Sequence, residues 1–146
     1  MKKTILALCA TLLLASISAC SMPAPSNLDL RLQQPSAKSL YAVSMRSLAA
    51  PIGVNQMHSW EIRVTTPAGA PVKQARIRFD GGMPQHGHGF PTSPKVTREL
   101  GDGRYLLEGM KFSMTGWWEM KLQIDAAPGR DEVKFNTVIA LPGAKP

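Results

Sequence analysis

Cysteine is nearly absent from the sequence. There are two cysteines among 146 residues, and both lie within the first twenty. From Ser21 onward the chain therefore has no disulfide, no thiolate metal ligand and no cysteine nucleophile. Any soft metal ligand in that part has to be a methionine or a histidine.

A hydrophobic run long enough to span a bilayer is also missing. Residues 5–15 are apolar but have only the length of a signal-peptide core, and Lys2 and Lys3 precede them. The small residues Ser18 and Ala19 then lead to Cys20, an order that resembles the lipobox of bacterial lipoproteins. The sequence thus predicts a lipoprotein signal peptide over residues 1–19 and a lipid anchor on Cys20.

The lipobox resemblance implies that the protein is located in the cell envelope. Acyl chains on Cys20 would attach the protein to a membrane, with its domain facing the periplasm. Ser21, rather than an aspartate, follows the cysteine. In enteric-type bacteria this implies sorting to the outer membrane.

The chain is predicted to hold one domain behind a tether. Residues 20–39 contain the lipidated cysteine and a stretch rich in proline and small polar residues, which is typical of a flexible tether. Within it Leu28, Leu30 and Leu32 alternate as in an edge strand. Residues 40–146 are long enough to form a single core.

Helical periodicity is lacking along the domain. Short segments of alternating apolar and polar residues recur instead, separated by turns, which is typical of an all-β, immunoglobulin-like sandwich. Trp60 and Trp118 lie on the apolar sides of their segments and are predicted to be core, whereas Trp117 lies on the opposite face. The seven predicted strands cover residues 41–48, 57–66, 72–80, 95–100, 104–112, 117–125 and 131–141.

Basic clusters interleaved with exposed aromatic residues are absent too. The formal charge of +7 falls to +5 once Lys2 and Lys3 leave with the signal peptide, and the other basic residues are spread along the chain. This is typical of a solvated basic surface, so no nucleic-acid partner is predicted. Attraction to anionic envelope surfaces is compatible with it.

Histidine is scarce, yet two of the three histidines stand in one glycine-rich stretch, MPQHGHGFP, at residues 83–91. The connection over residues 81–94 has no strand pattern and is the longest in the domain, and such connections are often functional. In an extended segment residues two apart point the same way, so His86 and His88 can converge. Two neutral imidazoles make half a metal site, and the thioether of Met83 favours copper, above all Cu(I), over zinc.

Methionines elsewhere could complete this site. Met110 and Met114 stand just before a predicted strand and would reach the histidines if their corner folds beside the loop. Met57 and His58 begin another predicted strand and are secondary candidates. Spacing alone does not place these residues at one end of the sandwich.

Several stretches, in this order, resemble the YtkA-like domain family, which also occurs in FixH-type proteins. They are a W-x-I-x-V strand, MPQHGHG, GDGRY and FSMTGWW, and the resemblance covers about residues 59–135. It implies an immunoglobulin-like sandwich outside the cytoplasmic membrane, and a role in copper handling or in assembly of copper-containing oxidases. The family motif falls on Met83, His86, His88 and Met114. One departure is the lipobox, where FixH-type proteins carry a transmembrane helix.

Two functions are compatible with these features. The first is a copper carrier, chaperone or assembly factor that passes Cu(I) to an acceptor protein. Its ligands would be Met83, His86, His88 and Met114, with Met110 as a further candidate. The second is a metal-free accessory module for a protein partner, in which the histidines only fix their loop; an exposed Trp117 would favour it. The sequence offers no nucleophile beside a base and no phosphate-binding loop, so no enzyme is predicted.

Overall fold

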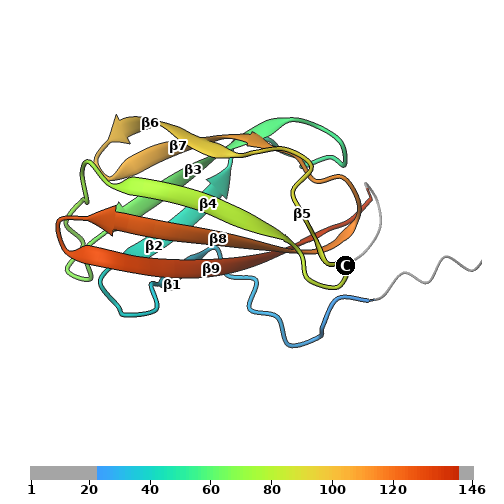
Figure 1. The fold of residues 1–146 in the computed structure, drawn as a ribbon, viewed down its shortest axis with the longest axis horizontal. Coiled ribbons are helices and arrows are strands. Elements are labelled where there is room, and N and C mark those ends of the chain that lie inside the picture. Colours follow the sequence, from blue (N-terminus) through green and yellow to red (C-terminus); the bar gives the residue numbers. More distant parts are fainter. Residues whose placement is uncertain (1–22, 142–146) are drawn as a thin grey trace, which may run out of the picture.

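The computed structural model describes residues 23–141, which form two antiparallel sheets packed face to face (Figure 1). One sheet has the order β1-β2-β3-β7-β6, and the other has the order β5-β4-β8-β9. The strands are β1 (Gln33–Pro35), β2 (Ala42–Ser47), β3 (His58–Thr65), β4 (Arg76–Met83), β5 (His88–Gly89), β6 (Lys95–Gly101), β7 (Arg104–Met110), β8 (Gly116–Ala126) and β9 (Gly129–Ile139). The prediction of an all-β, immunoglobulin-like sandwich is confirmed, and each of the seven predicted strands overlaps one of these.

Alternation along the strands builds the core between the sheets. Side chains on a strand point to opposite faces in turn, so every second residue can be buried. Both tryptophans predicted to be core, Trp60 and Trp118, are buried. Two of the inner rows are Trp60, Ile62 and Val64 on β3, and Trp118, Met120, Leu122 and Ile124 on β8.

The expectation that residues 81–94 lack strand structure was wrong. β4 continues through Met83, and His88 and Gly89 form the short strand β5 against it. Glycine hides this hairpin from a sequence pattern because it has little strand propensity. The close approach requires it: a Cβ at Gly81 would lie 2.1 Å from the carbonyl oxygen of Glu119, and one at Gly82 would lie 2.2 Å from that of His88.

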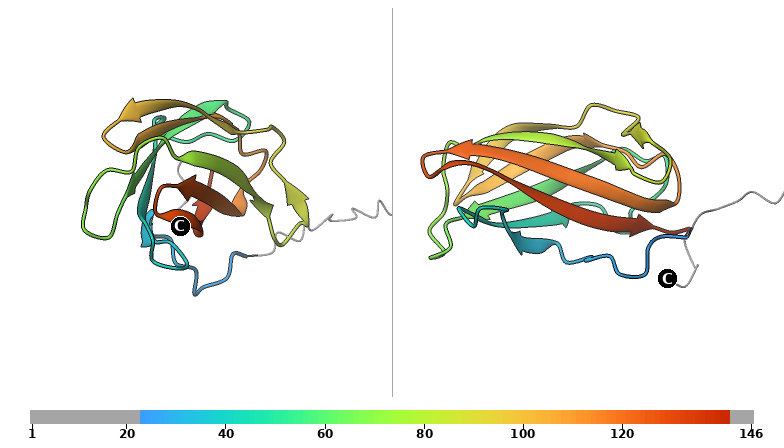
Figure 2. Two further views of the ribbon diagram at one scale, coloured as in Figure 1. Left: turned by 60° about the vertical axis from the view of Figure 1, so that its left-hand side comes forward. Right: turned by 60° about the horizontal axis from the view of Figure 1, so that its bottom comes forward.

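The folded unit begins upstream of residue 40, where the sequence placed the end of the tether. β1 pairs with β2 through Gln33, Gln34 and Pro35, and Figure 2 shows the preceding segment running along the outside of the sandwich. The buried carboxylate of Asp131, on β9, accepts hydrogen bonds from the Ser36 hydroxyl (2.5 Å) and from the backbone amides of residues 38 and 40. These long-range contacts could not be read from a proline-rich composition.

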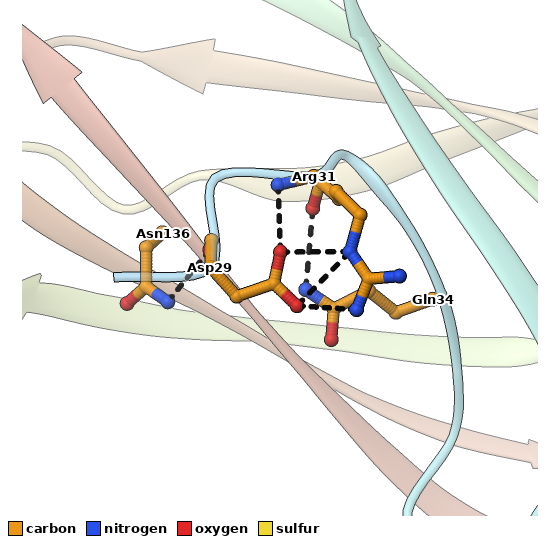
Figure 3. A network of polar contacts seen from close by, with 4 residues as sticks. All are labelled: Asp29, Arg31, Gln34 and Asn136. Atoms are coloured by element: carbon orange, nitrogen blue, oxygen red, sulfur yellow. Dashed lines mark hydrogen bonds and ion pairs between the residues drawn. The ribbon is translucent and has the colours of Figure 1, made fainter. Parts of the chain in front are cut away.

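A second set of contacts holds the segment before β1 (Figure 3). The side-chain amide of Asn136, on β9, donates to the backbone carbonyl of Asp29 at 3.1 Å. Arg31 pairs with the Asp29 carboxylate at 2.6 Å, and these side-chain hydrogen bonds lower the pKa of Asp29 to about 2. At the start of the segment, the Gln85 amide donates to the Pro23 carbonyl at 2.9 Å, which ties the segment to the β4–β5 turn.

Within residues 23–141 no helix is long and apolar enough to cross a membrane. The predicted signal peptide and the predicted lipidation site, Cys20, lie outside the described residues.

Candidate metal centre

All three histidines lie at the same end of the sandwich, at the right in Figure 1, where β4, β7 and β9 finish and β3 and β8 begin. We call this the histidine end. His58 opens β3, while His86 and His88 belong to the β4–β5 hairpin. Four methionines share this end, namely Met57, Met83, Met110 and Met114. The antiparallel register thus gathers soft donors from three connections and the strand ends beside them.

The hairpin turn holds His86 and His88 side by side. The carbonyl of Met83 accepts hydrogen bonds from the amides of His86 and Gly87, both at 3.0 Å, and Gly87 adopts φ +66°, which favours glycine. The two exposed rings have centroids 5.9 Å apart. A metal held by one ring nitrogen lies about 3.2 Å from that ring's centre, so two such rings can be up to about 6.4 Å apart. The pair is therefore within reach of one ion.

The orientation of His88 leaves one nitrogen ready to bind. Its Nδ1 lies 3.0 Å from the carbonyl oxygen of Gly89. A carbonyl can only accept, so Nδ1 carries the proton and Nε2 keeps its lone pair. The edge-on ring of Trp118, 5.9 Å away, packs against the imidazole. This combination resembles the second-sphere support that orients histidine ligands.

Trp118 also connects the loop to Met114. Its indole N–H donates to the Met114 carbonyl at 3.1 Å, so Met114 lies on a corner attached to the ring that His88 contacts. The Met114 side chain is 37% exposed. The structure therefore brings the corner that precedes β8 beside the turn that carries His86 and His88, which we call the histidine loop. The sequence alone had left open whether the two segments lie together.

Met83 faces inward rather than into the turn. Its side chain is 1% exposed, and its terminal methyl lies 2.9 Å from where a Cβ at Gly116 would be. Gly116, with φ +120° at the start of β8, makes room for this thioether. Met83 thus belongs to the same corner, where its side chain is buried against the start of β8.

Met110 is not part of this corner. It is fully buried on β7, in the other sheet, where its Cα is paired with that of His58. The ring of Phe112 contacts both His58 (5.3 Å) and Trp118 (5.3 Å). Phe112 therefore lies between the pair of His58 and Met110 and the turn that carries His86 and His88. Among the aromatic pairs of residues 23–141, the ring of His58 is paired with Trp60 and Phe112 and not with His86 or His88.

An aromatic floor, formed by Phe90, Phe112 and Trp118, supports the histidine loop. Phe90 follows β5 and packs against Trp118 (4.9 Å) and Phe112 (5.6 Å). Sequence reasoning predicted Trp118 to be core and did not connect any of these rings with His88, which contacts Trp118. The available signal was their place directly beside the two motifs, Phe90 after HGHG and Trp118 within FSMTGWW.

Carboxylates near the centre are engaged elsewhere. Glu119 on β8, paired in register with Gly82, forms ion pairs with Lys121 (2.9 Å) and Lys134 (3.0 Å). Burial would raise the pKa of Glu119, but hydrogen bonds from the two lysines outweigh it and lower the pKa. Among residues 23–141 no three histidine, cysteine, aspartate or glutamate side chains gather as a metal-binding group. Candidate donors beside the imidazoles are thus thioethers.

Fold and site together define a class: a β-sandwich with two exposed imidazoles over an aromatic floor and thioethers beside them. The model of the YtkA-like family matches residues 41–123, more than half of the chain, and the chain belongs to this family. The matched segment contains the whole candidate centre. No curated protein and no solved structure gives a significant match.

Proposed function

We propose that the protein is an envelope lipoprotein that binds copper, as Cu(I), at the histidine loop and serves as a carrier, chaperone or assembly factor for an acceptor protein. The observation that carries this proposal is the pair of exposed imidazoles of His86 and His88, whose centroids are 5.9 Å apart. Met83 and Met114 supply thioethers on the same corner. Imidazole with thioether is a donor set that suits Cu(I).

The exposure of the site supports transfer rather than storage. Both histidines and Met114 are exposed, whereas Met83 is buried beneath them. An ion held there would have protein on one side only, so an acceptor with stronger ligands could approach it directly. The absence of cysteine after Cys20 fits the same role, because thiolates would hold Cu(I) more tightly.

The test is an anaerobic Cu(I) competition titration with a chromophoric chelator, on the chain from Ser21 onward, which contains every described residue. The variant His86→Ala/His88→Ala should lose one equivalent of bound copper while keeping the circular dichroism of the wild type. Gln85→Ala is the matched control, since it alters the same turn without removing a soft donor. A folded double variant that still binds as many equivalents as the wild type would refute the proposal.

The proposed envelope location depends on lipidation of Cys20 and is tested separately. Labelled palmitate should be incorporated into the full-length protein and lost in Cys20→Ala. A wild-type protein that stays unlabelled would remove the lipid anchor from the proposal without touching the copper site.

A second candidate function, a metal-free module for a protein partner, is favoured by a different observation. Five of the six large apolar side chains that are exposed in the described chain lie at or near the histidine end. They are Leu48, Met57, Met114, Val138 and Leu141. Trp117, by contrast, is half-buried and donates to the Asn136 side chain at 2.9 Å. It is therefore not a free docking residue.

The two candidates differ in what a crosslinker would capture. A photoreactive residue at Met57 should trap a partner with or without copper if the module is metal-free, and only with copper if the partner is an acceptor. The same residue at Asp102, exposed in the β6–β7 turn at the opposite end, is the control. Equal capture from both positions would argue against a docking end of either kind.

A further inference from the structure

We propose that His58 and Met110 form a second soft-metal site, inside the sandwich and separate from the histidine loop, that binds one Cu(I)-like ion. His58 is the first residue of β3 and Met110 the last of β7, and their Cα atoms are partners in the antiparallel register. Both side chains are buried, at 9% and 0% exposure. Residues paired in this way have neighbouring side chains, so an imidazole and a thioether lie together here.

The local backbone is shaped around His58. The pairing of β3 with β7 shifts register between His58 and Trp60. Such bulges re-aim side chains and are frequent beside functional sites. The irregularity thus falls at the residue that carries the imidazole.

The tautomer of His58 is fixed by its neighbour in the chain. Its Nδ1 lies 3.0 Å from the carbonyl oxygen of Gln56. Because a carbonyl accepts and cannot donate, Nδ1 holds the proton and Nε2 has a free lone pair. This is the arrangement that a metal-binding histidine adopts when a backbone carbonyl orients it.

The Nε2 atom of His58 is buried and has no hydrogen-bond partner among the residues that the structure describes. Its ring lies against Phe112 at 5.3 Å and Trp60 at 6.3 Å. A buried acceptor without a partner is unfavourable, and native proteins rarely keep one without a reason. The orphaned lone pair is therefore an independent sign that something binds at this position.

The surroundings select the ion. A zinc site of the usual kind would take four nitrogen, sulfur or oxygen ligands, and a calcium or magnesium site would take several oxygens. No group of three or more histidine, cysteine, aspartate or glutamate side chains that could hold a metal exists in the described part of the chain. A soft d10 ion, which accepts few ligands and prefers thioether sulfur, fits the pair of His58 and Met110.

One alternative occupant is a water molecule. The indole N–H of Trp60 is also buried and finds no partner within residues 23–141. It is a donor, whereas His58 Nε2 is an acceptor. A single buried water could bridge the two atoms. Only the metal reading involves Met110, which separates the two experimentally.

The test uses the chain from Ser21 onward carrying His86→Ala/His88→Ala, in which His58 is the single remaining histidine. The protein is labelled with 15N-histidine, titrated with Ag(I) as a redox-inert substitute for Cu(I), and followed by NMR. We expect the Nε2 resonance to move and split by one-bond coupling to silver, with saturation at one equivalent, while Nδ1 stays protonated. Met110→Leu should abolish this response, and Met120→Leu, a buried methionine on β8, should not.

Two results would overturn the inference. The first is an Nε2 resonance that ignores Ag(I) in the folded protein. The second is an Nε2 response to Ag(I) that survives Met110→Leu, because the proposed site requires the Met110 thioether. Since both loop histidines are absent from the sample, failure here leaves the loop site untouched, and failure of the loop site leaves this result standing.

Discussion

The two ends of the sandwich are built from different residues. At the end opposite the histidines, the connections are turns such as those around Gly69, Gly103 and Gly129, each glycine with positive φ, and the described connections there contain no histidine or methionine. At the histidine end, the connections and the strand ends beside them carry three histidines and four methionines. We call the first the turn end. The difference suggests that stability is concentrated at one end and ligand chemistry at the other, and it can be tested by perturbing each separately.

The largest effect is expected at the turn end, from Asp131→Ala. The substitution removes the acceptor of Ser36 and of the amides of Lys38, Leu40 and Glu132. Leaving these donors unpaired should lower the free energy of unfolding by about 3 kcal/mol. Urea denaturation measures the loss, and copper binding should be unchanged. Glu132→Ala, which removes an exposed neighbouring side chain, is the control and should stay within about 0.5 kcal/mol.

A smaller loss is expected at the histidine end, from Gly82→Ala. The new Cβ would meet the His88 carbonyl oxygen at 2.2 Å and the Gly89 Cα at 2.7 Å, so β5 has to separate from β4. Overpacking of this kind costs about 2 kcal/mol. Here copper binding should weaken as well, because the hairpin positions both histidines. Gly89→Ala meets only the Gly81 carbonyl oxygen, at 3.4 Å, and should bind normally; equal damage from both variants would contradict the role of Gly82.

Acid should weaken the turn end through Asp131. Burial would raise the pKa of Asp131, but hydrogen bonds from Ser36 and from backbone amides outweigh it and hold the pKa below its usual range. Such a carboxylate stabilises the fold at pH values above its unfolded pKa, near 4, and the contribution is lost as pH falls through the lower folded pKa. The urea midpoint of the wild type should therefore drop below about pH 4. Asp131→Asn should be less stable at neutral pH and flatter across this range; an unchanged slope would contradict the assignment.

The two ends also differ in how much of them the sequence predicted. Strands and core followed from alternation, because burial of one sheet face imposes a period of two on residues such as Trp118, Met120 and Leu122. The convergence of His86 and His88 was predicted because they stand two residues apart in a glycine-rich stretch. The hairpin β4–β5 did not, since Gly81 and Gly82 are there for close backbone approach, which leaves no pattern of hydrophobicity.

The sequence alone did not reveal how strands that are distant in the chain pair with one another. Met110 and Met114 are four residues apart, yet one points into the core opposite His58 and the other sits beside the histidine loop. The end of β7 falls between them, and only the pairing of β7 with β3 determines on which side each residue stays. The same reason hid the attachment of residues 33–40 to β2 and Asp131. Contacts between distant segments depend on the assembled sheets.

The smallest effect on stability, and the sharpest test of the contrast between the ends, is expected from His86→Ala/His88→Ala. Both rings are exposed, and the hydrogen bonds that close the turn run between backbone atoms of Met83, His86 and Gly87, so truncation removes little packing. The free energy of unfolding should change by less than about 0.5 kcal/mol, as for other surface substitutions. Trp118→Phe is the comparison: it keeps a ring beside His88 but loses the bond to the Met114 carbonyl, and should cost about 1 kcal/mol. If the histidine variant were the less stable of the two in urea denaturation, the histidines would be part of the framework, and the division between a structural end and a binding end would fail.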